Sequence, residues 1–401
     1  MSDRETPGSE LSPGAKRALL VVTVLYAAAV IPIGIHKGSD FIQELRQSER
    51  LLHGLPLYVA NPPRGIWWPP FTTLGLVPFA LVARWSLALS QACWATLNVA
   101  CLGWSVGRAR GWATGWTPVV LALAAVGKPL QSNFEYLNLT PILLALVVAA
   151  AVDLQAGRES RAGAWIGLAT AIKGFPALLL LYLAYRRRWR GVATGIAVAG
   201  GLTVGAMLPY GPVDAVSAVG DWLRLSGQGH MFARLGSQSL WGFAFLLGWP
   251  SSAIWLAAVA CLCGVWVALH RTARESDPVY EVGLATLLAV LLSPIAWLYY
   301  YALAFPAWVG VLTRPAPRSP RARYLRVATL ILAGILTSGA LTFSAYPPFL
   351  WFIRNATYTW GGLLLLTILI AERACREHSP TLSDSPVAIE VTGEFRAPDS
   401  R

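Results

Sequence analysis

Charged residues are scarce in this 401-residue chain, and their scarcity excludes an ordinary soluble protein. Asp, Glu, Lys and Arg make up 13% of the sequence, whereas a soluble domain carries about 25%. Acidic residues are the rarer kind, with 20 Asp and Glu against 32 Lys and Arg. This excess of positive charge does not indicate nucleic-acid binding, because the basic residues fall between apolar runs, as in the cytoplasmic loops of membrane proteins. We therefore expect a membrane protein and no nucleic-acid partner.

Cysteine and the common cofactor motifs are also rare or missing. The five cysteines are odd in number and four lie inside apolar runs, so neither a disulfide framework nor a metal site is expected. The sequence has no D-x-D motif for a nucleotide sugar, no Walker loop and no G-x-S-x-G elbow. We expect no cofactor, and a donor delivered through the membrane fits better than a soluble nucleotide.

Long apolar runs are abundant, and 55% of the residues are hydrophobic. Runs of about 20 residues are long enough to cross a bilayer. With the Arg clusters placed in the cytoplasm, the sequence predicts an all-α polytopic membrane protein of about twelve spans with both ends inside. The predicted spans are 18–35, 86–107, 112–127, 138–154, two short helices within 162–185, 191–209, 251–269, 280–292, 298–312, 327–343 and 357–370.

The remaining segments complete this topology. We predict a disordered cytoplasmic N-terminus at 1–15, one integral membrane domain at 16–372 and a disordered cytoplasmic tail at 373–401. Residues 36–85 and 210–250 are predicted to be large loops on the outer face of the plasma membrane. Within the first loop, 71–83 is apolar but short and contains Pro78, so a re-entrant or interfacial segment is expected instead of a span. Trp67 and Trp68 suit an aromatic belt at the interface.

The stretch 38–58 is unusually polar for this chain and follows the first span directly. Ile42, Leu45, Glu49 and Leu52 recur at helical spacing, which predicts a short helix lying in the membrane interface. Asp40 begins that helix, and we expect it to be a catalytic carboxylate. The structural alternative is that Asp40 is only an N-terminal helix residue, with Ser39 as the cap.

Other polar residues on the predicted outer face are candidates for substrate binding. Lys173 is a lone cation at a Gly-Pro interruption of an apolar run, where charge is costly and usually functional. Cations near a lipid surface suit a phosphate head group. The alternative for each candidate is that it is a solvated loop residue or an interface residue without a role in binding. Glu44, Glu49 and Arg50 are interpreted as a solvated face of the helix. The candidate substrate-binding residues are His53, Glu135, Asn138, Lys173, Arg234, Tyr299 and Tyr300.

Six short motifs, in order, resemble the polyprenyl-phosphate-sugar-dependent membrane glycosyltransferases of the GT-C superfamily, and most closely glycosyltransferase family 87, which includes mycobacterial mannosyltransferases. Two motifs depart from the family pattern: Glu135-Tyr136 stands in place of G-Q, and Tyr299-Tyr300 in place of paired His. Asp40 precedes these motifs, which are Leu52–Tyr58 (L-H-G-L-P-L-Y), Trp68–Phe71 (W-P-P-F), Asn138–Leu144 (N-L-T-P-I-L-L), Gly167–Pro176 (G-L-A-T-A-I-K-G-F-P), Gln238–Gly242 (Q-S-L-W-G) and Ser293–Trp297 (S-P-I-A-W).

The resemblance implies a GT-C helical bundle and an inverting transfer of a hexose, with mannose expected, from a polyprenyl phosphate to a lipid or glycan acceptor outside the cell. Asp40 would be the general base, and Lys173 and Arg234 would hold the phosphate. Two alternatives stay open at the level of the sequence. One is a transporter or flippase of a lipid-linked sugar, although no internal repeat is evident. The other is a family member without catalytic activity.

Overall fold

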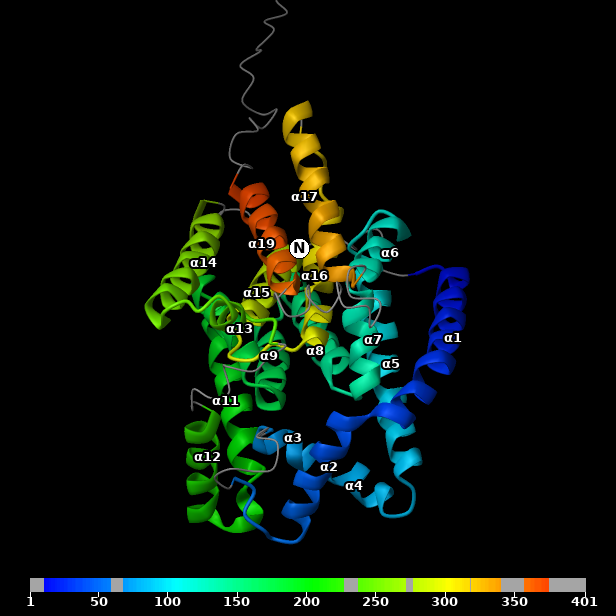
Figure 1. Cartoon of the computed structure of the whole chain (residues 1–401), viewed down its shortest axis with the longest axis vertical. Coiled ribbons are helices and arrows are strands. Elements are labelled where there is room, and N and C mark those ends of the chain that lie inside the picture. The colour runs from blue at the N-terminus through cyan, green and yellow to red at the C-terminus, as the bar shows by residue number, and fades with distance from the viewer. Residues whose placement is uncertain are drawn as a thin grey trace, which may run out of the picture.

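A computed structural model describes residues 11–58, 68–226, 237–271, 277–317, 319–339 and 357–374 of the chain. All regular structure within these ranges is helical (Figure 1). The elements are α1 (Pro13–Lys37), α2 (Ser39–Leu52), α3 (Pro70–Gly75), α4 (Val77–Ala83), α5 (Leu87–Arg110), α6 (Trp116–Ala125), α7 (Gly127–Tyr136), α8 (Thr140–Gln155), α9 (Glu159–Ile172), η1 (Phe175–Ala177), α10 (Leu178–Tyr185), α11 (Trp189–Gly205), η2 (Leu208–Tyr210), α12 (Pro212–Ser226), α13 (Leu240–Leu246), α14 (Ser251–Arg271), α15 (Pro278–Leu292), η4 (Leu298–Ala304), α16 (Phe305–Leu312), α17 (Pro320–Ser338) and α19 (Thr357–Ala374).

The described part of each predicted span is mainly helical, so the all-α prediction is confirmed for the described residues. Within the described part of the chain, three helical stretches are long and apolar enough to cross a membrane: Pro13–Lys37, Trp189–Tyr210 and Ser252–His270. Others, such as α6 and α8, are apolar but shorter. The number of twelve spans therefore stays a prediction.

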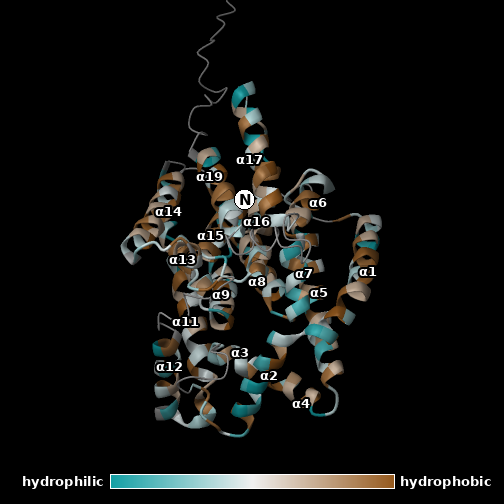
Figure 2. Ribbon diagram, viewed as in Figure 1, coloured by the Kyte–Doolittle hydropathy of each residue, from teal (hydrophilic) through white to brown (hydrophobic). Residues whose placement is uncertain are grey.

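Apolar side chains on the outside of the bundle point to a membrane environment. Figure 2 shows hydrophobic residues along α1, α14 and α17 and hydrophilic ones at their ends and on α2. Leu20, Leu256 and Leu325 are each more than 60% exposed on these three helices. Exposed apolar surface on this scale is unfavourable in water and indicates contact with lipid. The chain is a membrane protein.

The segment 71–83 forms two short helices instead of one. α3 and α4 meet at Leu76, and their 6 and 7 residues are each too few to cross a bilayer. α3 and α4 lie with α2 and α12 at one end of the molecule, the lower end in Figure 1. The Tyr210 hydroxyl donates to the carbonyl oxygen of Leu55 at 2.8 Å and joins the two predicted outer loops there. That this end lies at the membrane interface remains a prediction.

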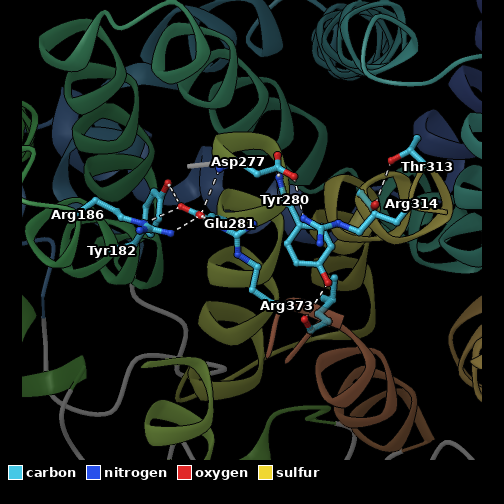
Figure 3. Close-up of polar contacts among 10 residues, drawn as sticks. Tyr182, Arg186, Asp277, Tyr280, Glu281, Thr313, Arg314 and Arg373 are labelled. Carbon is cyan, nitrogen blue, oxygen red and sulfur yellow. Dashed lines mark hydrogen bonds and ion pairs between the residues drawn. The ribbon is translucent and has the colours of Figure 1, made fainter. Parts of the chain in front are cut away.

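A network of ionised side chains occupies the region around the start of α15. Glu281 is fully buried and accepts hydrogen bonds from Arg373 Nη2 at 2.6 Å, Arg186 Nε at 2.9 Å and the Tyr182 hydroxyl at 3.0 Å (Figure 3). One carboxylate thereby ties α10 and α19 to α15. The other end of α15, at Leu292, leads to η4 and the candidate site, so α15 connects the two polar regions of the bundle.

Candidate active site

The turn between α1 and α2 sets the position of Asp40. Gly38 makes this turn, and a Cβ there would lie 2.7 Å from both the Gly34 carbonyl oxygen and the Leu137 side chain. Only glycine fits such a close approach of backbone and side chain. α2 therefore begins directly against the ends of α1 and α7, with Asp40 in its first turn.

The Asp40 carboxylate is held by two side chains from distant parts of the chain. Its Oδ2 accepts hydrogen bonds from Asn138 Nδ2 at 2.9 Å and from the Tyr299 hydroxyl at 3.0 Å. The alternative in which Ser39 caps the helix is wrong, because Gly38 is the N-cap and no side chain forms a capping bond. No described residue donates to Oδ1. One oxygen of Asp40 is thus fixed, and the other is available to a substrate.

Asn138 is presented to Asp40 by a strained turn. Leu137 ends α7 with φ 54° and ψ 46°, a left-handed conformation that is rare for a bulky residue. The Trp94 indole donates to the Leu137 carbonyl oxygen at 2.9 Å and holds the turn. Asn138 is fully buried, so it is not a residue of the membrane surface. Strain of this kind persists where the surroundings impose it and is common at functional sites.

Tyr299 and Tyr300 belong to η4 and are both buried. Their rings meet edge to face with centroids 4.8 Å apart. Tyr299 donates to Asp40, while the Tyr300 ring lies 5.6 Å from Lys173 Nζ. The two residues that replace the paired His of the family pattern therefore face the carboxylate and the cation of the site.

Lys173 lies in the turn that follows α9, as the Gly-Pro interruption predicted. Its Nζ stands 3.4 Å from the centroid of the Trp68 ring, a cation–π contact. Thr72 donates to the carbonyl oxygen of Ile172 at 2.6 Å and anchors α3 to the residue just before this turn. Lys173 is thereby positioned by the segment that precedes α3 and by α3 itself.

Trp68 is an interior residue and not part of an aromatic belt, which corrects the prediction for this side chain. It is 3% exposed. The Gln47 amide exchanges two hydrogen bonds with the Trp68 backbone, at 3.2 Å to its carbonyl oxygen and at 3.3 Å from its N–H. α2 therefore supplies Asp40 and also holds the aromatic ring beneath Lys173.

Burial shifts the ionisation of the groups at this end of α2. Burial raises the pKa of Asp40, while its hydrogen bonds to Asn138 and Tyr299 and the charge of Lys173 oppose the shift. Lys173 lies in a turn outside the helices, and burial lowers its pKa to about 8, against the attraction of Glu44 and Asp40. Both shifts bring the groups closer to neutral pH, where proton transfer is efficient.

The prediction that Glu44 is solvated is wrong. The buried face of α2 also differs from the one predicted from helical spacing. The buried side of the helix carries Phe41, Glu44 and Leu45, whereas Leu52 is 38% exposed. Glu44 itself is 1% exposed. Burial, together with the charge of Asp40, raises its pKa well above the ordinary value. Glu49, in contrast, is at the surface as predicted, where it pairs with Arg84 at 2.8 Å.

Three predicted residues are not brought to Asp40 by described contacts. His53 ends α2, is exposed, and lies 3.5 Å from Glu49. Glu135 pairs with Lys37 and Lys128, each at 3.8 Å. Arg234 lies outside the described residues. The structure thus gathers Asp40, Asn138, Lys173, Tyr299 and Tyr300 and leaves the others as predictions.

Sequence reasoning missed Glu44, Gln47 and the role of Trp68. A signal for Glu44 was present, because a residue four positions after Asp40 lies on the same face of a helix. No local signal marks Trp68, since its contact with Lys173 joins residues far apart in the chain.

The arrangement combines a base, a cation and aromatic walls. An ionised carboxylate can accept a proton from a hydroxyl, and a buried ammonium can neutralise a phosphate. Aromatic rings such as Trp68 and Tyr300 provide flat apolar surfaces beside these polar groups. Such a set suits transfer of a group from a phosphate to a hydroxyl.

Comparisons with known proteins identify the class. The sequence profile of Glycosyltransferase family 87 matches residues 67–294, which is more than half of the chain. The chain belongs to glycosyltransferase family 87 and is a glycosyltransferase. The profile match excludes α2 and η4, which carry Asp40 and Tyr299. No solved structure matches the chain significantly.

Characterised relatives are distant but cover most of the chain. A polyprenol-phosphate-mannose-dependent alpha-(1-2)-phosphatidylinositol pentamannoside mannosyltransferase of Mycolicibacterium smegmatis is 27% identical over 76% of this chain and 74% of its own length. A protein of the same name from Mycobacterium tuberculosis is 27% identical, with shares of 76% and 71%. An alpha-(1->3)-arabinofuranosyltransferase of Corynebacterium glutamicum is 24% identical, with shares of 88% and 85%.

Proposed function

We propose that this glycosyltransferase moves a hexose, namely mannose, from a polyprenyl phosphate to a hydroxyl of a lipid or glycan acceptor. The observation that carries the proposal is the meeting of Asp40, Asn138, Tyr299 and Lys173 at one end of the bundle. The names of the mannosyltransferase relatives support the donor. The arginine distribution supports an active site on the outer face of the plasma membrane.

In the proposed reaction Asp40 is the general base. Asn138 and Tyr299 hold its Oδ2 so that Oδ1 faces the acceptor hydroxyl. Oδ1 takes the hydroxyl proton as the acceptor oxygen bonds to the anomeric carbon. The bond between that carbon and the phosphate oxygen breaks, and polyprenyl phosphate leaves with the bonding electron pair. Attack from the face opposite the phosphate inverts the anomeric centre.

Lys173 stabilises the leaving group in this scheme. Its ammonium lies within electrostatic range of Asp40 and is packed on Trp68, and it forms no ion pair with a described residue. It can therefore turn to a phosphate without breaking a salt bridge. A preorganised cation at the developing charge lowers the barrier more than a flexible surface cation would.

The first prediction is that Asp40→Asn lowers kcat by about 10²–10⁴-fold, the usual contribution of a general base. The amide oxygen can still accept the hydrogen bonds from Asn138 and Tyr299, so the fold and donor binding should be kept. Purified protein, labelled polyprenyl-phosphate mannose and a membrane lipid extract provide the assay. Asp221→Asn removes a carboxylate from the surface of α12 and should keep wild-type turnover.

Two results would contradict parts of the proposal. An Asp40→Asn variant that binds donor and keeps more than about a tenth of wild-type kcat would remove Asp40 from the mechanism. If the wild-type protein prefers polyprenyl-phosphate arabinofuranose to the mannose donor, the transferred sugar is a pentose and the proposed hexose is wrong. The name of the corynebacterial relative makes this second donor the proper comparison.

A further inference from the structure

Glu44 is a second carboxyl group in the candidate site. It lies four residues after Asp40 on α2, so the two side chains are one helical turn apart on the same side of the helix. It is 1% exposed, and neither of its oxygens accepts a hydrogen bond from a described residue. No described residue pairs with it as a counter-ion. A polar group buried without partners is unfavourable and requires an explanation.

The groups around Glu44 are those of the candidate active site. The charges that act on it are those of Asp40 and Lys173. Tyr299 and Tyr300 lie within electrostatic range of both carboxyl groups. Glu44 therefore lies within electrostatic range of both the proposed base and the proposed phosphate-binding cation. In the proposed reaction Asp40 is at the attacking oxygen and Lys173 at the leaving oxygen, so the sugar ring must lie between them.

The chemistry of Glu44 suits a hydroxyl group. Burial and the neighbouring Asp40 charge favour its neutral, protonated form. A protonated carboxyl has one O–H donor and one carbonyl acceptor, and a sugar hydroxyl likewise donates and accepts. Because Glu44 has no hydrogen bond to a described residue, its flexible side chain can turn toward a substrate without losing one. A bound hydroxyl would satisfy both of its oxygens.

We propose that Glu44 is a substrate-contacting residue that binds a ring hydroxyl of the transferred hexose between Asp40 and Lys173. The inference rests on the proposed function and assigns to the site a determinant of sugar specificity. If Glu44 were only a poorly satisfied interior residue, its replacement by a neutral side chain would increase stability and leave turnover unchanged. The two explanations therefore differ in a measurable way.

The experiment compares Glu44→Leu, Glu44→Gln and Glu49→Gln in the full-length purified protein. Glu44→Leu should keep or raise the Tm, because it removes an unpartnered buried carboxyl, while kcat/KM for the mannose donor falls about tenfold or more. The kcat/KM of Glu44→Gln should lie between those of Glu44→Leu and wild type, since an amide also donates and accepts hydrogen bonds. Glu49→Gln removes a surface carboxylate of the same helix and should stay within about twofold of wild type, as surface pairs contribute little.

Deoxy donors separate direct contact from an indirect effect on Asp40. Mannosyl donors that lack one hydroxyl in turn are tested on wild type and Glu44→Leu. For one of them, wild type should lose about tenfold or more in kcat/KM, whereas Glu44→Leu should use it as well as the complete donor, because the contact is already gone. The substitution and the missing hydroxyl each lower kcat/KM by some factor. If these two factors multiply for every deoxy donor, Glu44 does not bind a ring hydroxyl.

The outcomes also distinguish this inference from the proposed function. Suppose that wild type transfers mannose and that kcat/KM of Glu44→Leu stays within about twofold of the wild-type value, less than the loss of a hydrogen bond would cause. Only the Glu44 inference then fails. If wild type transfers no sugar from a polyprenyl phosphate, the proposed function fails and the inference fails with it.

Discussion

At the scale of single residues, the proposed mechanism requires opposite charges on Asp40, at the attacking hydroxyl, and on Lys173, at the leaving phosphate. Asp40 must be ionised to accept a proton, whereas Lys173 must be protonated to attract a phosphate. The pKa of Asp40 is raised by burial and that of Lys173 is lowered to about 8. The pH range in which both groups have the required charge is consequently narrower than for the same residues in water.

The pH dependence of kcat/KM should therefore be bell-shaped. As pH falls, Asp40 is protonated at a value above its ordinary pKa, and activity is lost on the acid side. As pH rises through about 8, Lys173 loses its proton and donor binding weakens. Lys173→Arg should remove the basic limb, because arginine stays protonated throughout this range. Initial rates at donor concentrations below KM, between pH 5 and pH 10, are the measurement.

Lys173→Ala is the matching test of the residue itself. Loss of the cation should raise the KM for the lipid donor much more than that for the acceptor, since only the donor carries the phosphate. A folded variant with an unchanged donor KM would show that Lys173 does not bind the phosphate. A basic limb that persists near pH 8 in Lys173→Arg would assign it to another group.

At the scale of elements, the packing of α9 on α11 holds the Lys173 turn in place. Both helices carry a small-xxx-small pattern, Gly163–Gly167 on α9 and Gly191–Gly195 on α11. A Cβ at Gly163 would lie 2.0 Å from the Gly191 carbonyl oxygen, and one at Gly167 would lie 2.4 Å from that of Gly195. Glycines of this kind let membrane helices approach closely.

Gly163→Ala should therefore destabilise the protein by about 1–3 kcal/mol, the usual cost of overpacking. The added methyl group meets backbone, which cannot move aside as a side chain can. Gly200→Ala, also on α11, is the control, because a Cβ there meets nothing within 4 Å. Thermal unfolding in detergent should show a lower Tm for the first variant and an equal or higher Tm for the second. Equal Tm values for both would mean that the helices are not in close contact.

At the scale of the whole molecule, the Glu281 network lies at the start of α15, while the other end of this helix leads to the candidate site. Removing a partner from a buried ion pair leaves charge uncompensated and costs about 3–5 kcal/mol. Glu281→Ala should thus lower the Tm strongly, because the guanidinium groups of Arg186 and Arg373 lose their shared carboxylate. Asp221→Ala breaks an exposed pair and should change the Tm little. A similar Tm for both variants would contradict a stabilising role for the network.

The predicted orientation in the membrane is a second property of the whole molecule. A cysteine at Arg224, which is 68% exposed on α12, should react with an impermeant thiol reagent added to intact cells. A cysteine at Arg190, at the start of α11, should react only after the membrane is permeabilised. The background protein should lack the five native cysteines. The opposite labelling pattern would invert the topology and place Asp40 in the cytoplasm.

The sequence by itself determined where the helices form, where the run at Lys173 breaks, and which family the chain resembles. These properties depend on local patterns: apolar length, Gly and Pro as helix breakers, and motifs of a few residues. The position of Asp40 just after the first long helix follows from the same patterns. The exact buried face of α2 did not, because its amphipathic pattern is interrupted by buried polar residues such as Gln47 and Glu44.

Only the tertiary structure decided which residues meet. Asn138 and Tyr299 are 98 and 259 positions from Asp40, yet both donate to the same oxygen. The burial of Glu44 and the placement of Trp68 under Lys173 likewise depend on how α2 and α3 pack against α7 and α9. Contacts between distant segments arise from helix packing, and one sequence without relatives aligned to it contains no local pattern that specifies them. For this reason the helices and several site residues could be predicted one by one, whereas the contacts that join these residues could not.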